Sequence, residues 1–262
     1  MIRLRPVPGL SALFLTLAAL TASACTLPLS AEAKDEWKRT YQLTQGGSVE
    51  IRNTNGEIRV EAAEGNTVDV IAVRVARAGS DEDARNALKR MDITETVSPN
   101  RVALDSTKGW TGLDMHVSRR VDYVVKVPKW ANVTLHSTNG ELFASGLTST
   151  LRLETTNGEI RATALEGSVR AETTNGDVWL DIAKLGEDGV TCSTTNGEVD
   201  VILPSSVKAS LDIQTNNGDI DTRGLQLNVS EKARKDLRAT VGGGGPKIKV
   251  ETTNGDITVK GR

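Results

Sequence analysis

The sequence predicts an all-β protein that winds as a right-handed β-solenoid with coils of 18–21 residues. Three observations favour this fold. An Asn-Gly step recurs seven times, apolar and polar residues alternate before each step, and only 3% of the 262 residues are aromatic. Alternation is typical of a half-buried strand, and a recurring period of this length indicates stacked repeats. The scarcity of rings predicts a narrow core filled by aliphatic side chains.

The Asn-Gly steps set the boundaries of the repeat. Successive steps are 84, 18, 18, 21, 21 and 37 residues apart. The two long spacings predict insertions into the solenoid, at about residues 78–120 and 225–246. The seven asparagines are Asn55, Asn139, Asn157, Asn175, Asn196, Asn217 and Asn254.

The residues that flank each step keep the same character in every copy. Positions four and six before the Asn are always apolar, positions three and five are always polar, and the third position after the Asn is again aliphatic. Each unit is therefore a strand, a corner and a second strand. The position four before the Asn holds Ile51, Leu135, Leu153, Ala171, Cys192, Ile213 and Val250.

The corner fits two architectures. Glycine supplies the positive φ of a bend, and asparagine tolerates the left-handed region. An antiparallel β-hairpin array, with Asn-Gly as a two-residue turn, gives the same inward and outward pattern and stays open as an alternative. The solenoid also explains why like residues recur in register, because stacked amides and hydroxyls can hydrogen-bond along the axis. The threonine column is Thr155, Thr173, Thr194, Thr215 and Thr252.

Both insertions are expected to carry short helices. In the first, residues 68–75 and 121–127 predict strands, and Ser80 followed by three acids predicts a capped helix. In the second, residues 230–237 predict a short helix. Residues 242–245 are four glycines without the Lys-Ser/Thr ending of a phosphate loop, so we expect a flexible return to the next coil.

The N-terminus resembles an export signal. Residues 1–24 combine two arginines, an apolar run and small residues before Cys25, which is the order of a secretory signal peptide. Ala-Ser-Ala-Cys resembles a lipoprotein box, so we expect lipidation at Cys25, a tether over residues 25–45 and a place in the outer membrane or periplasm. Cleavage by an ordinary signal peptidase would instead release a secreted soluble protein.

Composition excludes several function classes. A net charge of −2 with mixed signs argues against a nucleic-acid partner, and two Cys with two His rule out a Cys/His zinc framework. We expect Cys192 to be a buried hydrophobe, not a redox thiol, and His116 and His136 to be exposed. No catalytic residue, cofactor or metal site is assigned.

Two surface patterns are candidate sites. The first is an acidic ridge, because an acid follows every Asn-Gly step. Stacked carboxylates could bind a ligand or a cation such as Ca²⁺, or could simply form a solvated edge. The ridge residues are Glu57, Glu141, Glu159, Asp177, Glu198, Asp219 and Asp256.

The second pattern is an aromatic strip of Phe143, Arg161 and Trp179, which are spaced 18 residues apart. Adjacent coils would stack the Arg161 guanidinium between the two rings on the outer face. Such a platform could bind sugar rings or a partner protein. The alternative is that the long insertion packs over it.

Several of these segments together resemble a known family. The chain is similar to the bacterial putative-adhesin family, a domain of unknown function related to the head-GIN domain. The similarity lies in residues 121–128 (VDYVVKVP), residues 133–142, which contain the Asn139-Gly140 step, and Gly146-Leu147. The later Thr-Thr-Asn-Gly-acid-aliphatic units look like the same family's repeats. The resemblance covers roughly residues 46–262 and implies an exported β-solenoid with no known active site.

These features favour a non-enzymatic, exported cell-envelope protein, an adhesin-like binding or scaffolding module. Its expected partners are an unknown envelope protein or a glycan, and the membrane through Cys25 if that residue is acylated. One alternative is an envelope-stress sensing lipoprotein that binds a membrane partner. A polysaccharide-active β-helix enzyme is disfavoured, because no basic residue recurs beside the ridge acids as a general base.

Overall fold

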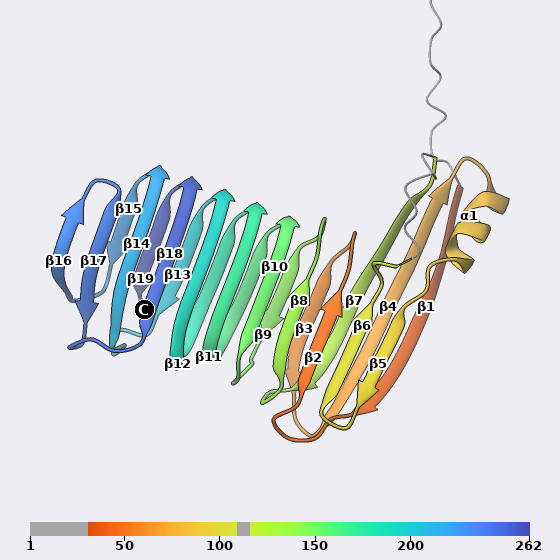
Figure 1. The fold of residues 1–262 in the computed structure, drawn as a ribbon, viewed down its shortest axis with the longest axis horizontal. Helices are drawn as coiled ribbons and strands as arrows, with labels where there is room; N and C mark the ends of the chain where they lie inside the picture. Colours follow the sequence, from red (N-terminus) through yellow and green to blue (C-terminus); the bar gives the residue numbers. More distant parts are fainter. Residues whose placement is uncertain (1–30, 109–115) are drawn as a thin grey trace, which may run out of the picture.

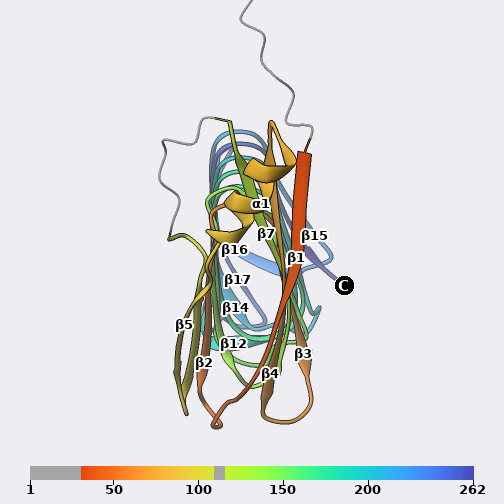
Figure 2. The ribbon, with the colours of Figure 1, turned by 90° about the vertical axis from the view of Figure 1, so that its right-hand side faces the viewer.

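The structure is a computed structural model that describes residues 31–108 and 116–262, and these form a long rod of two facing β-sheets (Figures 1 and 2). The repeat strands pair in parallel, with Leu153 beside Ala171 and Ala171 beside Cys192. This pairing confirms the all-β solenoid. The antiparallel hairpin array is wrong for the repeats, since it would separate these three residues.

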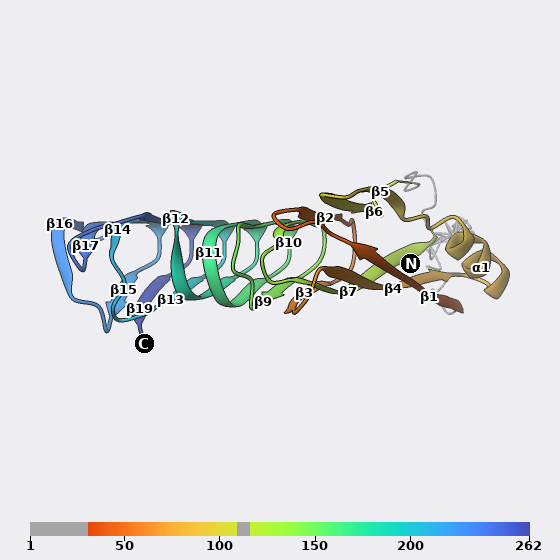
Figure 3. The same ribbon diagram turned by 90° about the horizontal axis from the view of Figure 1, so that it is seen from below.

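The central coils show how the chain winds. Strand β10 (Leu151–Asn157) lies in the first sheet. Strand β11 (Ile160–Asn175) begins in the second sheet beside β9 (Leu142–Ser145), crosses over, and ends in the first sheet beside β10. Strand β12 (Val178–Asn196) repeats this path one layer further along (Figure 3). One coil is thus a first-sheet strand, an Asn-Gly corner and a second-sheet strand.

Each sheet runs the length of the rod. In order from the helical end, the first sheet contains β5 (Thr94–Ser98), β6 (Arg101–Asp105), β2 (Ser48–Arg52), β8 (Asn132–His136), β10, the C-terminal parts of β11 and β12, β18 (Lys247–Asn254), β14 (Ala209–Asn217), β17 (Asp236–Val241) and β16 (Leu227–Ala233). The second contains β1 (Ala31–Gln42), β4 (Thr67–Ala78), β7 (Ser118–Pro128), β3 (Ile58–Ala63), β9, the N-terminal parts of β11 and β12, β13 (Val199–Leu203), β19 (Ile257–Gly261) and β15 (Ile220–Arg223).

The last two coils are stacked in the reverse of their sequence order. The β18–β19 coil, which carries Asn254, lies between the Asn196 and Asn217 coils. The β6–β7 segment of the first insertion similarly lies outside the earlier β2–β3 coil. At both ends the chain runs outward and returns, so the last coil in sequence is not the last in space.

The core between the sheets is aliphatic, as predicted. Its fully buried side chains are almost all Val, Ile, Leu and Ala, and Tyr123 is the largest. The threonine column is also buried, and each Thr Oγ1 donates to a glycine carbonyl of the neighbouring coil at 3.0–3.1 Å. These bonds satisfy polar groups that would otherwise be costly to bury.

The Asn-Gly corners are held by a ladder of side chains. Six hydrogen bonds join the seven asparagines: each Nδ2 donates at 2.8–2.9 Å to the Oδ1 of the neighbouring asparagine on the side of Asn55, and the Asn55 Nδ2 donates to the Arg119 carbonyl. None of the seven asparagines has a positive φ, so the expectation that they use the left-handed region is wrong. Their role is the ladder.

The two insertions differ from each other. The first contains the predicted helix, α1 (Asp81–Lys89), whose N-cap Ser80 accepts from the Asp83 amide, and the helix packs on β1 and β4. The helix predicted over residues 230–237 is wrong. Those residues lie in the antiparallel hairpin β16–β17, because β17 pairs with the otherwise open edge of β14.

The N-terminal part of the fold begins earlier than predicted. Residues 31–42 form β1, which pairs along its whole length with β4, so the tether assigned to residues 25–45 is wrong from Ala31 onward. The signal peptide over residues 1–24 and lipidation at Cys25 lie outside the described residues. Within the ranges that are described, no helix combines the length and the apolar character needed to cross a membrane.

Candidate binding surface

The acidic ridge lies along the corner where the second sheet begins. The parallel register places its seven members on successive strands, and the Asp219 and Asp256 positions exchange order with their coils. The structure also adds Asp122 of β7, which precedes Tyr123, the register partner of Ile58. The sequence could not place Asp122 in the ridge, because β7 has no Asn-Gly step before it.

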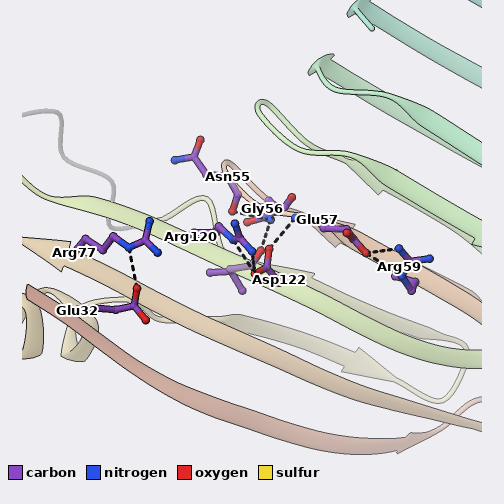
Figure 4. Close-up of polar contacts among 10 residues, drawn as sticks. Glu32, Asn55, Gly56, Glu57, Arg59, Arg77, Arg120 and Asp122 are labelled. Carbon is purple, nitrogen blue, oxygen red and sulfur yellow. Dashed lines mark hydrogen bonds and ion pairs between the residues drawn. The ribbon is translucent and has the colours of Figure 1, made fainter. Parts of the chain in front are cut away.

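Several of the ridge acids are already partnered. Arginines two residues away pair with Glu57, Glu159 and Asp122 at 2.7–2.8 Å. Figure 4 shows Arg59 and Arg120 turned toward their carboxylates. The hydrogen bond and charge of Asp122 raise the pKa of Arg120.

Aspartates of the ridge also bind backbone. The carboxylates of Asp122, Asp177 and Asp256 each accept the amide N–H of the acid on the next strand, at 2.8–3.0 Å. Across residues 31–108 and 116–262, no three His, Cys, Asp or Glu side chains come close enough together to hold a metal ion. Arginines and backbone amides thus already partner several carboxylates of the ridge.

The aromatic strip lies on the outer face of the second sheet. Arg161 is in register with Phe143 on one side and Trp179 on the other, so the three side chains lie together as the spacing predicts. The Arg161 guanidinium lies 5.5 Å from the Trp179 ring centroid, whereas Arg59 lies 4.2 Å from the Phe143 ring. The predicted sandwich of Arg161 between two rings is thus replaced by two successive arginine–ring pairs.

The line of the strip continues toward the helical end. Val124 of β7 is in register with Arg59, and Ile71 of β4 with Val124. Both aliphatic side chains are unusually exposed for their type, at 41% and 36%. The described part of the long insertion therefore lies beside the strip and lengthens its apolar line, and does not cover it.

The rest of this face is hollowed and charged. A hollow of about 210 Å³ is lined by residues of β1, β4 and β7, among them Val73 and Val75. Two further lining residues, Arg77 and Glu32, pair with each other at 2.8 Å (Figure 4). A second hollow, of about 400 Å³, lies at the first two Asn-Gly corners. The face thus combines one apolar and cationic line with a flanking row of acids.

The remaining candidate side chains do not form a catalytic set. Cys192 is buried, as predicted, and that burial raises the pKa of its thiol. His136 is half-buried, with its Nδ1 2.9 Å from a Glu154 carboxylate oxygen, so the expectation of an exposed side chain is wrong there. His116 is exposed.

One known protein family matches most of this chain. A family model described as Toastrack DUF4097 matches residues 34–260. The chain belongs to the Toastrack DUF4097 family. This membership confirms the resemblance inferred from the Asn-Gly units, and it extends the domain to include β1. Among curated proteins, no match to this chain is found.

Several solved structures are similar to this Toastrack chain. A putative cell adhesion protein from Clostridium sporogenes is 13% identical, with a TM-score of 0.43 over 88% of this chain and 100% of its own. A putative adhesin from Bacteroides fragilis is 14% identical, with a TM-score of 0.42 over 88% and 98%. A putative lipid binding protein from Parabacteroides distasonis is 9% identical, with a TM-score of 0.31 over 86% and 96%.

Proposed function

We propose that this Toastrack protein is a non-enzymatic, adhesin-like binding module that holds an envelope partner against the outer face of its second sheet. The observation that carries the proposal is the aromatic strip. Phe143 and Trp179 are only half-buried, and each ring lies under an arginine. Rings and guanidinium groups are enriched at the centres of binding interfaces, where they contribute most of the affinity.

The rod supplies the rigidity that such a surface needs. The strip residues stand on strands whose backbones pair on both sides, so little ordering is required when a partner binds. The row of acids beside the strip would favour a partner with basic or hydroxyl groups facing it. The same face therefore supports a protein or a glycan partner, and no cofactor is needed.

Export is part of the proposal. The charged, apolar and small segments of residues 1–24 support removal of a signal peptide, and Cys25 supports a lipid anchor. Mass spectrometry of the mature N-terminus tests this directly. A diacylated or triacylated Cys25 is expected, an unmodified Cys25 would indicate secretion, and a retained Met1 would contradict export.

The binding face can be tested with a photo-crosslinking amino acid in living cells. It is placed at Ser145, which lies two residues beyond Phe143 on β9, or at Ser193 in the outer row of the first sheet as the matched control. We expect a discrete crosslinked partner from Ser145 and none from Ser193. Equal crosslinking from both positions, or none from Ser145, would contradict the assignment.

The strip itself is tested by Trp179→Ala. Removing the indole should reduce the Ser145 crosslink at least tenfold, while circular dichroism and thermal unfolding keep the folded signature. Trp37→Ala is the control, since Trp37 also lies under an arginine, Arg39 at 4.7 Å, but on β1 outside the strip. A Trp179 variant that crosslinks like wild type would remove the strip from the binding site.

A further inference from the structure

A third hollow lies at one end of the strands, away from the aromatic strip. It measures about 590 Å³ and is lined by residues of four loops, between β1 and β2, β3 and β4, β5 and β6, and β7 and β8. These loops lie at the lower end of the ribbon in Figure 2. Its lining residues are Gln42, Leu43, Thr44, Gln45, Asn66, Pro99 and Trp130. The volume is in the range of small-molecule sites.

The four loops are fixed to one another by their backbones. The Leu43 amide donates to the Asn66 carbonyl at 2.8 Å, and the Thr44 amide donates to the Pro99 carbonyl at 2.7 Å. Thr44 also accepts from Gly47 in a tight turn whose third residue, Gly46, has φ +79°. The hollow is therefore preformed, as a binding site on loops of a rigid scaffold requires.

The lining carries one flat ring and several free amides. Trp130 is half-buried with its ring packed on the core, and Gln42, Gln45 and Asn66 are exposed. None of these four side chains makes a hydrogen bond to the part of the chain that the structure describes. Their donors and acceptors are thus available to a ligand.

The lining also lacks charge. The ionised groups on the same loops, Lys129 and Glu64, pair with each other at 3.0 Å and are not among the lining residues. A charged ligand would find no counter-ion in the hollow. This disfavours nucleotides, phosphosugars and free amino acids, and it favours a neutral ligand.

We propose that this hollow is a binding site for a neutral saccharide, separate from the strip on the second sheet. Carboxamide groups both donate and accept, which matches the dual character of sugar hydroxyls. The apolar C–H face of a sugar ring packs on an indole, while Thr44 and the amides bind its edge. The site gives the rod two independent contact points, one at a face and one at the strand ends.

Calorimetric titration of the mature chain with cellobiose and with diacetylchitobiose tests the proposal. We expect saturable binding of at least one of these probes and none of glucuronate. Asn66→Ala and Gln45→Ala remove exposed amides without touching the core and should weaken binding at least fivefold. Trp130→Phe keeps a ring in the packed position and should weaken it by about tenfold.

The outcomes separate this site from the strip. Trp179→Ala should leave the saccharide titration unchanged, and Asn66→Ala should leave the Ser145 crosslink unchanged. Absence of binding for both neutral probes would overturn the proposal. So would wild-type affinity in the amide variants, or displacement of the probe by a proline-rich peptide that binds the same residues more tightly, since tryptophan grooves also bind such peptides.

Discussion

The glycine of each Asn-Gly step is required by the distance between coils. A Cβ built on Gly158 would lie 2.1 Å from the Gly140 carbonyl oxygen, and Gly176 repeats this contact against Gly158. Gly158 has no positive φ, so backbone strain is not what excludes a side chain there. The coils pack backbone against backbone at this corner, and only glycine fits.

Gly158→Ala should therefore destabilise the rod by about 1 to 3 kcal/mol, the usual cost of overpacking a site that cannot relax. Gly79→Ala is the matched control, because its Cβ would meet nothing within 4 Å and its φ is not positive. That change should alter the free energy of unfolding by less than about 0.5 kcal/mol. Urea unfolding of both variants measures the difference, and equal stabilities would contradict the close approach.

Cys192 provides a second test at the residue scale. Burial raises the pKa of its thiol, so the reactive thiolate is scarce near neutral pH. In a Cys25→Ser chain, maleimide should label Cys192 only after unfolding. Ser193→Cys, one residue on and facing outward, should be labelled in the folded state. Rapid labelling of Cys192 in the native protein would show that the apolar column containing Cys192 is accessible to solvent.

At the scale of elements, antiparallel strands cap the two ends of the rod. β1 and β4 continue the second sheet at the helical end, and β17 and β16 continue the first sheet at the other. An open sheet edge invites association with other chains, and the outermost strands β1 and β16 are rich in charged side chains, which oppose such association. Asp212 ties one such cap together, since it lies 2.6 Å from Lys247 of β18 and 3.7 Å from Arg238 of β17.

This cluster predicts a pH dependence. The hydrogen bond from Lys247 holds the pKa of Asp212 below its usual 3.8. Because the folded pKa is the lower one, the stabilisation is present above about pH 4 and is lost as the pH falls through the folded value. Asp212→Asn should cost less than about 1 kcal/mol at pH 7, given the partial exposure of the pair, and nothing at pH 2.

Urea unfolding at the two pH values measures this effect. Glu231→Gln serves as the control, because Glu231 pairs with the same arginine at 2.9 Å but is more exposed. The free energy of unfolding of the Glu231→Gln variant should differ little from that of the wild type at either pH. An Asp212→Asn variant with the same deficit at pH 2 and pH 7 would contradict the electrostatic cause.

Local pattern could predict the coils but not the caps. The alternation around each Asn fixes which residues face the core, and the 18-residue spacing fixes which of them stack. Residues 230–237 contain good helix formers, yet they pair as strands because the β14 edge is available to them. Residues 31–42 looked like a tether because strongly charged edge strands lack a clear apolar face.

For the whole molecule, sequence order and spatial order differ at both ends. A spacing of 37 residues shows that the chain leaves the stack and returns, but it does not say on which side of the Asn217 coil the chain returns. For the same reason the position of β7 could not be predicted. This strand brings Asp122 and Val124 to the candidate surface without an Asn-Gly step. Predicting these placements needs long-range pairing, which no local pattern contains.

The central claim is that the coils stack in parallel and in register, with the Asn254 coil between those of Asn196 and Asn217. Disulfide trapping tests it most directly, in a chain with Cys25 replaced by serine and Cys192 left in the core. Residues 195 and 253 lie on adjacent strands in register, whereas residues 195 and 216 are separated by one strand. Neighbours in register are close enough for a disulfide, and residues two strands apart are not.

The account predicts that Thr195→Cys with Thr253→Cys crosslinks under mild oxidation and that Thr195→Cys with Asn216→Cys does not. The opposite result would mean that the coils stack in sequence order. Failure of both pairs in a folded protein would contradict the parallel stack itself, and with it the continuous surfaces on which the proposed binding sites depend.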